Sequence, residues 1–157
     1  MTSSSAPARI RVKQLTVRSG RLEAEVEVYP PGAHSTPALA RVLRGMNPRL
    51  AGHACVNDVG DCFGDVMDHT PLPHVLEHLA VDAQAQEYRA HASTDEGKVF
   101  VGTSEWIDDE RTVARVCMSF VDDLAALRAL REATAVLKSA LEQCVDEARC
   151  IHALCDD

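Results

Sequence analysis

Three residues within one short segment have the types and the spacing of a hydrolytic metal site. His74, Glu77 and His78 form the pattern H-x-x-E-H, the inverse of the H-E-x-x-H signature of zinc peptidases. On a helix the two histidines lie one turn apart, so both imidazoles can bind one metal ion. Glu77 lies beside them, where its carboxylate can take a proton from a water molecule that the metal activates. The pattern therefore predicts a zinc site with His74 and His78 as ligands and Glu77 as the general base.

A catalytic zinc site needs about three protein ligands and one open position, so a third ligand must come from another part of the chain. Glu105 is the first candidate, because a carboxylate within an otherwise apolar strand needs a reason to be there and a metal ion supplies one. The alternatives are His53, Cys55, His91, Asp108 and Asp109.

The same residues also have a plainer interpretation. The pentad is typical of a polar helix face on which histidine and glutamate form ordinary ion pairs, and Glu105 is typical of a strand residue that faces solvent. Arg89, Arg111 and Arg115 are candidates for binding a substrate carboxylate, with solvated surface charge as the alternative for each.

The composition limits the classes of protein to consider. The chain has 157 residues, of which 46% are hydrophobic and 25% charged, and this length suits one domain with a sizeable core. A formal net charge of -8 disfavours nucleic acid and anionic membranes as partners. No apolar run approaches the ~18 residues of a membrane span, and the N-terminus lacks the pattern of a secretion signal. We therefore expect a cytoplasmic protein with reduced cysteines.

Cys144, Cys150 and Cys155 gather with His152 near the C-terminus. Their spacing matches no standard zinc arrangement, so buried or scattered thiols on a helix are favoured over a second metal site.

The histidine motif is expected on a helix that begins at Thr70-Pro71-Leu72-Pro73 and runs to about Tyr88. Thr70 supplies a capping hydroxyl, and the prolines are confined to the first turn. Apolar side chains along one side should pack on a sheet, while the motif projects from roughly the opposite side. The motif is thus expected to face solvent or a second layer that forms a cleft.

Two β-hairpins are expected to form the sheet. Residues 9–18 and 21–28 alternate apolar and charged positions across a Ser19-Gly20 turn, with basic charges on the first strand facing acidic charges on the second. The second hairpin is placed at Arg89–Thr94 and Lys98–Ile107, around an Asp95-Glu96-Gly97 turn.

Helices should complete the fold. Ser35 or Thr36 caps a short helix that ends at Pro48, and residues 49–68 are expected to be irregular. Apolar residues at helical spacing predict a helix over about 113–127, and a further helix covers about 133–154.

These elements predict an α+β fold, a single two-layer domain in which helices pack on a small, mainly antiparallel sheet. Residues 1–8 would be a disordered tail, residues 9–131 the core, and residues 132–157 a helical C-terminal extension, with a break between helices near Arg131–Ala133.

The stretch Leu72–Gln84 resembles the segment G-H-V-I-E-H-I-A-L-E-L-Q in the N-terminal domain of cyanophycin synthetases. His53-Ala-Cys55 resembles the H-R-C segment upstream in that domain. Thr94–Trp106 resembles the family's T-D-E-P-G turn and the strand that ends in F-E-Y, and Asp108-Asp-Glu110 resembles the acidic run after it. Order and spacing agree over about residues 38–130.

The resemblance implies a free-standing version of this metallopeptidase-like domain, which in some members of the family cuts cyanophycin, an aspartate chain that bears arginines. By resemblance, His74 and His78 are metal ligands, Glu77 is the base and Glu105 is the third ligand. Pro73 departs from the family's glycine, and the family's basic loop before the motif is acidic here. A different peptide or amide is therefore an equal candidate for the substrate.

The leading hypothesis is a zinc-dependent peptidase or amidohydrolase that acts on a peptide or amide substrate. The alternative is a non-catalytic peptide- or polymer-binding module that kept the fold, and a structural or metal-sensing protein would need the C-terminal cysteines as ligands. The sequence is compatible with a homo-oligomer.

Overall fold

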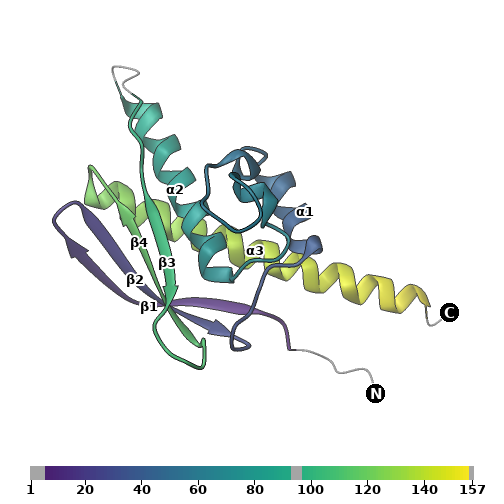
Figure 1. The fold of residues 1–157 in the computed structure, drawn as a ribbon. Helices are drawn as coiled ribbons and strands as arrows, with labels where there is room; N and C mark the ends of the chain where they lie inside the picture. The colour runs from purple at the N-terminus through teal and green to yellow at the C-terminus, as the bar shows by residue number, and fades with distance from the viewer. Residues whose placement is uncertain (1–5, 93–96, 156–157) are drawn as a thin grey trace.

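Within the described residues, four antiparallel strands form one layer, helices α2 and α3 lie against it, and α1 packs on α3, which gives the α+β fold that the sequence predicts (Figure 1). The strand order is β1-β2-β4-β3, so β1 and β3 are the two edges. The computed structural model describes residues 6–92 and 97–155, and the side chains of 152–155 lie outside the description.

The first hairpin confirms its prediction. Strand β1 (Arg9–Arg18) pairs with β2 (Arg21–Tyr29), and Gly20 makes the turn at φ +70°, a backbone conformation that glycine adopts without strain. Arg11 and Glu27 form the expected cross-strand ion pair, 2.6 Å between Nη2 and Oε2.

The second hairpin lies further along the chain than predicted. Strand β3 (Gly102–Trp106) pairs with β4 (Val113–Ser119), so the helix predicted over 113–127 is wrong for its first half. Ala114, Val116 and Met118 are buried at every second position, which is the period of a strand packed on one face. The apolar residues in this stretch fit both the helical period of 3.6 and the strand period of 2, so the sequence alone does not decide between a helix and a strand.

Residues 89–91, predicted to begin that second hairpin, are helical instead. Helix α2 (Leu72–His91) continues to His91, one turn beyond the predicted end. The predicted turn residues Asp95 and Glu96 lie outside the described residues.

The other two helices pack on each other, and α3 also packs on α2. Helix α1 (Pro37–Met46) is capped by Thr36, whose Oγ1 accepts a hydrogen bond from Leu39 N at 3.2 Å. Helix α3 (Asp123–Cys155) is continuous, so the predicted break near 131–133 is wrong. Small and apolar residues in its first half face the core: Ala126, Ala129, Leu130, Ala133, Leu137 and Ala140.

Helix α2 is enclosed on several sides, which explains why its apolar pattern is weak. It packs on β3, β4 and α3, and the segment 50–67 covers another side. That segment contains two 3-10 turns, η1 (Leu50–Gly52) and η2 (Phe63–Asp65). Of the two predicted surroundings for the histidine motif, the structure shows a second layer, formed by segment 50–67.

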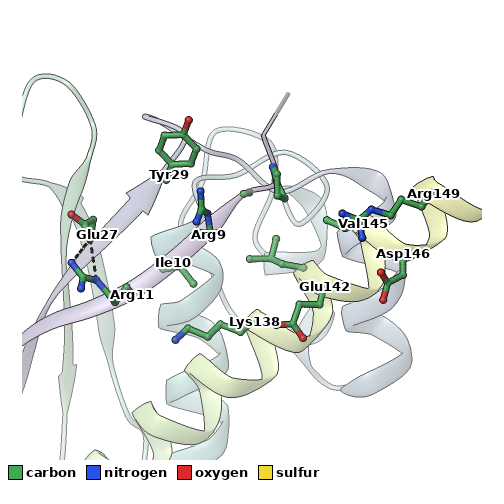
Figure 2. A pocket seen from close by; sticks show the side chains of 13 residues that line it. Arg9, Ile10, Arg11, Glu27, Tyr29, Lys138, Glu142, Val145, Asp146 and Arg149 are labelled. Atoms are coloured by element: carbon green, nitrogen blue, oxygen red, sulfur yellow. Dashed lines mark hydrogen bonds and ion pairs between the residues drawn. The ribbon is translucent and has the colours of Figure 1, made fainter. Parts of the chain in front are cut away.

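A groove of about 780 Å³ lies between the hairpin β1–β2 and the second half of α3 (Figure 2). Ile10, Tyr29 and Lys138 are among the residues that line it, and none of the residues of the histidine motif does. Within the part of the chain described here, no helix has the length and apolar character to cross a membrane.

Candidate metal centre

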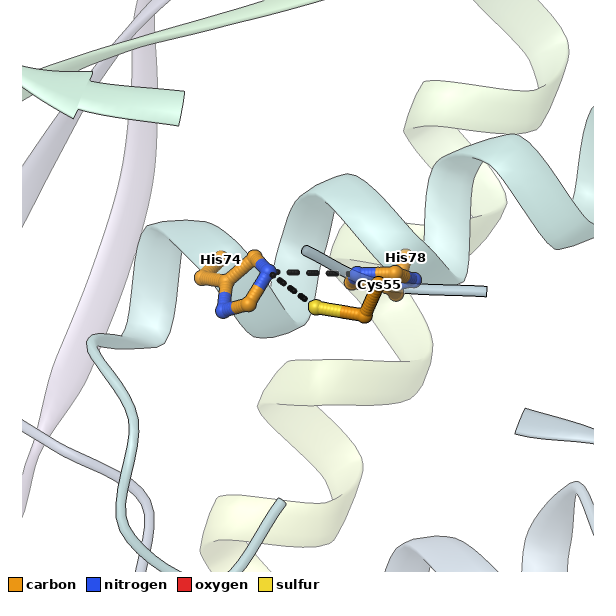
Figure 3. A group of neighbouring side chains, drawn as sticks. All are labelled: Cys55, His74 and His78. Atoms are coloured by element: carbon orange, nitrogen blue, oxygen red, sulfur yellow. Dashed lines mark hydrogen bonds between the residues drawn. The ribbon is translucent and has the colours of Figure 1, made fainter. Parts of the chain in front are cut away.

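Cys55, His74 and His78 meet beside helix α2, and their ligand atoms all lie within 4.8 Å of one another (Figure 3). His74 Nε2 lies 3.1 Å from His78 Nε2 and 3.4 Å from Cys55 Sγ. Zinc bonds of about 2.0 Å to nitrogen and 2.3 Å to sulfur, set at tetrahedral angles, place neighbouring ligand atoms roughly 3.3–3.6 Å apart. The group therefore has the spacing of a metal site and could hold a metal ion.

Two elements supply the three side chains. Both histidines come from the first half of α2, one turn apart as predicted. Cys55 comes from segment 50–67, where its amide donates to Asp61 O at 3.0 Å and the adjacent Ala54 forms an isolated bridge with Cys62. This local pairing holds the thiol against the helix.

Thr70 supports His74 instead of capping α2. Pro71 is the N-cap residue and makes no side-chain cap bond, so the predicted capping role of Thr70 is wrong. The Thr70 hydroxyl lies 2.8 Å from His74 Nδ1, and Thr70 is itself buried. With Nδ1 engaged, Nε2 is the ring nitrogen of His74 that faces Cys55.

Burial keeps both histidines in the form that binds metals. Phe63 stacks on the His78 ring, with centroids 4.1 Å apart, and presents its edge toward His74 at 5.3 Å. Burial lowers the pKa of His74. Burial, followed by the charges of His74 and His53, lowers the pKa of His78 to about 3. Both imidazoles are neutral at pH 7, so their lone pairs are free for a metal ion.

Glu77 lies at the interface of α2 with β3, next to the metal cluster in sequence but not part of it. Its Oε2 accepts a hydrogen bond from Ser104 Oγ at 2.8 Å. Burial raises the pKa of Glu77, and the Ser104 bond opposes that rise. Gly102 permits the close approach, because a Cβ there would lie 2.6 Å from Glu77 Cγ. A carboxylate with a raised pKa is a stronger base than an ordinary glutamate.

Glu105 does not reach the histidines, which corrects the prediction that it is the third ligand. Gly102 and Ser104 face Glu77, so Glu105 points to the opposite face of the sheet by the alternation of a strand. There its side chain is 65% exposed and pairs with Arg115 at 3.1 Å. Cys55, one of the alternatives named from the sequence, stands in the place predicted for Glu105.

His53, a second alternative, lies behind His78 instead of beside it. Its Nδ1 is 3.4 Å from His78 Nδ1, the ring nitrogen on the side away from the cluster. On its other side, His53 Nε2 lies 2.9 Å from the buried carboxylate of Asp82. Asp82 is not among the residues that the sequence predicts for the site. The spacing indicates its position, because His74, His78 and Asp82 follow one another at four-residue intervals along one helix face.

The remaining ligand candidates serve other local structures. His91 is exposed at the end of α2, and its Nδ1 lies 2.9 Å from Glu87 O. Asp108 accepts hydrogen bonds from the amides of Thr112 and Val113 and so caps the turn between β3 and β4. Asp109, in the same turn, is exposed.

Arg89 and Arg111, which are predicted to bind substrate, lie on different elements. Arg89 is exposed near the end of α2, about 16 Å along the helix from His78 at 1.5 Å per residue. Arg111 lies in the turn between β3 and β4, where it adopts φ 58°. The position of Arg89 does not support a role in holding a substrate at Cys55, His74 and His78, and the role of Arg111 stays a prediction.

Compared with known proteins, the chain matches no protein-family model and no curated protein. The function must therefore be argued from the site itself.

Proposed function

We propose that the protein is a zinc-dependent hydrolase that cleaves a peptide or amide bond. The observation that carries the proposal is the convergence of one thiol and two neutral imidazoles, Cys55, His74 and His78, while the buried Glu77 comes directly before His78 on the same helix. Three protein ligands leave a fourth tetrahedral position open, which is the arrangement of catalytic zinc sites.

The donor set favours zinc over magnesium and calcium. Imidazole and thiolate ligands suit zinc, whereas magnesium and calcium prefer carboxylate and carbonyl oxygen. The single carboxylate adjacent to the cluster in sequence, that of Glu77, is held by Ser104 on β3. Because Glu77 is not one of the three metal ligands, its carboxylate can act as a base.

We assign each residue the following role. When bound, zinc lowers the pKa of a coordinated water towards ~7 and polarises a carbonyl group. Glu77 takes the proton of the attacking water at a carboxylate oxygen and later delivers it to the leaving amine. Ser104 donates to Oε2 of Glu77, which orients the carboxylate and leaves Oε1 for the proton. Phe63 packs on both histidine rings and contributes to their burial.

The test combines metal analysis with hydrolysis. We expect the wild-type protein to bind about one zinc ion per chain and His74→Ala to lose it. Glu77→Gln should keep the metal and lose at least about 100-fold in the hydrolysis of a quenched peptide library, the range for a general base. The matched controls are His91→Ala, on the exposed end of the same helix, and Glu105→Gln, on the outer face of the sheet.

Several results would contradict the proposal. A wild-type protein that binds no stoichiometric zinc would overturn it. Metal binding without hydrolysis of any peptide would indicate a binding module instead, and full activity in Glu77→Gln would remove the proposed base.

A further inference from the structure

Asp82 is a buried carboxylate with three hydrogen-bond partners, and it lies one helical turn beyond His78. Its exposed fraction is only 5%. Asn47 Nδ2 donates to Oδ2 at 2.7 Å, and Arg49 Nη2 donates to the same oxygen at 3.3 Å. The other oxygen, Oδ1, lies 2.9 Å from His53 Nε2. A buried charge of this kind is tolerated only when it is paired and hydrogen-bonded, as Asp82 is.

The imidazole of His53 connects Asp82 to the metal cluster. Its two nitrogens have different neighbours, Asp82 Oδ1 at one and His78 Nδ1, 3.4 Å away, at the other. The His53 and His78 rings are tilted by 50°, with centroids 5.6 Å apart. Asp82, His53 and His78 thus form one chain of polar contacts that ends at the cluster.

The carboxylate of Asp82 determines where the protons lie in this series of hydrogen bonds. An ionised carboxylate only accepts hydrogen bonds, so His53 Nε2 must donate to Asp82. When His53 carries that single proton, its other nitrogen is an acceptor, so His53 Nδ1 accepts from His78 Nδ1. His78 consequently carries its proton on Nδ1. Its Nε2 lone pair faces His74 Nε2, 3.1 Å away, at the point where the metal would bind.

We propose that Asp82 and His53 are positioning residues that fix the tautomer and the ring orientation of His78 for metal binding. The inference rests on the proposed metal centre and deepens it. Metal-ligating histidines commonly donate their second N–H to a carboxylate or another acceptor, which fixes the ring and raises its basicity. Here the donation passes through a second imidazole before it reaches the carboxylate.

The isosteric change Asp82→Asn separates this role from simple support of the fold. An asparagine amide can donate to His53 Nε2, which moves the His53 proton to Nδ1 and turns His78 Nδ1 into an acceptor. The proton of His78 then lies on Nε2 and blocks the metal position. We expect zinc affinity to fall about 10- to 100-fold, with a similar loss in His53→Gln.

The matched control is Asn47→Ala, which removes a different partner of Asp82 and leaves His53 in place. If Asp82 only supports the fold, Asn47→Ala and Asp82→Asn should both lower thermal stability and leave zinc affinity unchanged. Zinc affinity is measured by competition with a chelator of known affinity. The tautomer of His78 is read from ¹⁵N imidazole spectra of the metal-free protein, without any activity assay.

The expected signature is a His78 ring protonated on Nδ1 in wild type and Asn47→Ala, and on Nε2 in Asp82→Asn. Unchanged zinc affinity in both Asp82→Asn and His53→Gln would overturn this inference and leave the proposed function standing. A wild-type protein that binds no zinc would overturn both.

Discussion

The thiol sulfur of Cys55 lies 3.4 Å from Nε2 of His74, although the two residues belong to different elements and are 19 positions apart in the chain. This contact joins the covering segment 50–67 to helix α2 and turns a pair of histidines into a three-residue group. The first prediction tests it directly.

Replacing Cys55 with serine should weaken metal binding strongly, because a hydroxyl is a much poorer zinc ligand than a thiolate. With cobalt as a spectroscopic substitute, the wild-type protein should show sulfur-to-cobalt charge-transfer absorption that Cys55→Ser lacks. Cys62→Ser is the control, since Cys62 is exposed in the same segment. Retention of the sulfur band in Cys55→Ser would contradict the assignment.

Adding one methyl group at Gly102 should damage hydrolysis more than metal binding. A Cβ at this position would lie 2.6 Å from Glu77 Cγ and 3.0 Å from Oε1, so the glutamate must move. We expect Gly102→Ala to lower kcat at least about tenfold, the effect of displacing a general base, while zinc stoichiometry stays at the wild-type level. In Gly45→Ala the new methyl meets nothing within 4 Å, and that variant should keep full activity.

Phe63 should be the side chain in the covering segment whose loss costs the most stability. It is fully buried and stacks on His78. Phe63→Ala should lower the free energy of unfolding by about 3–5 kcal/mol, the range for truncating a buried aromatic ring. Urea unfolding of the metal-free protein measures this, with Val59→Ala as the exposed control. A loss below about 1 kcal/mol, typical of a surface substitution, would show that the segment does not pack as described.

Asp82 should contribute stability that is lost in acid. Burial alone would raise its pKa, but hydrogen bonds from His53 and Asn47, with the charge of His53, outweigh burial and lower the pKa to about 2. The ordinary value is 3.8, so the folded state binds its proton less readily than the unfolded chain. The contribution is complete above pH 3.8 and disappears as the pH falls toward 2; it amounts to about 2 kcal/mol.

This pH dependence is measured by chemical unfolding of the wild type and of Asp82→Asn between pH 2 and 6. The stability difference between the two should shrink as the pH falls through this window. A difference that stays constant across it would show that the carboxylate is not stabilised in the folded state.

Short-range sequence patterns correctly predict the elements whose formation depends on neighbouring residues. The Ser19-Gly20 hairpin and the helix that carries His74 and His78 follow from alternation, turn residues and helical spacing, and both are present. Val113–Ser119 was misassigned because its apolar residues fit two periods, and only pairing with β2 and β3 decides between them.

The third ligand could not be identified from spacing. Cys55 lies in a stretch with no regular period, so its approach to α2 depends on backbone pairing that the sequence does not reveal. The sequence pattern predicts a strand at Glu105 but does not reveal on which face of the sheet this side chain lies. Gly102 and Ser104 pack against Glu77, so the even-numbered positions of β3 face α2 and Glu105 faces the other way.

The division of the site between α2 and segment 50–67 also has a kinetic consequence. The helix is packed in the core, whereas Cys55 is carried by a segment whose regular structure consists of two 3-10 turns and one isolated bridge. Such segments open locally at a lower free energy than the core. The rate of zinc release should therefore report the local opening of segment 50–67, and a bound ion should slow amide hydrogen exchange there far more than in α2.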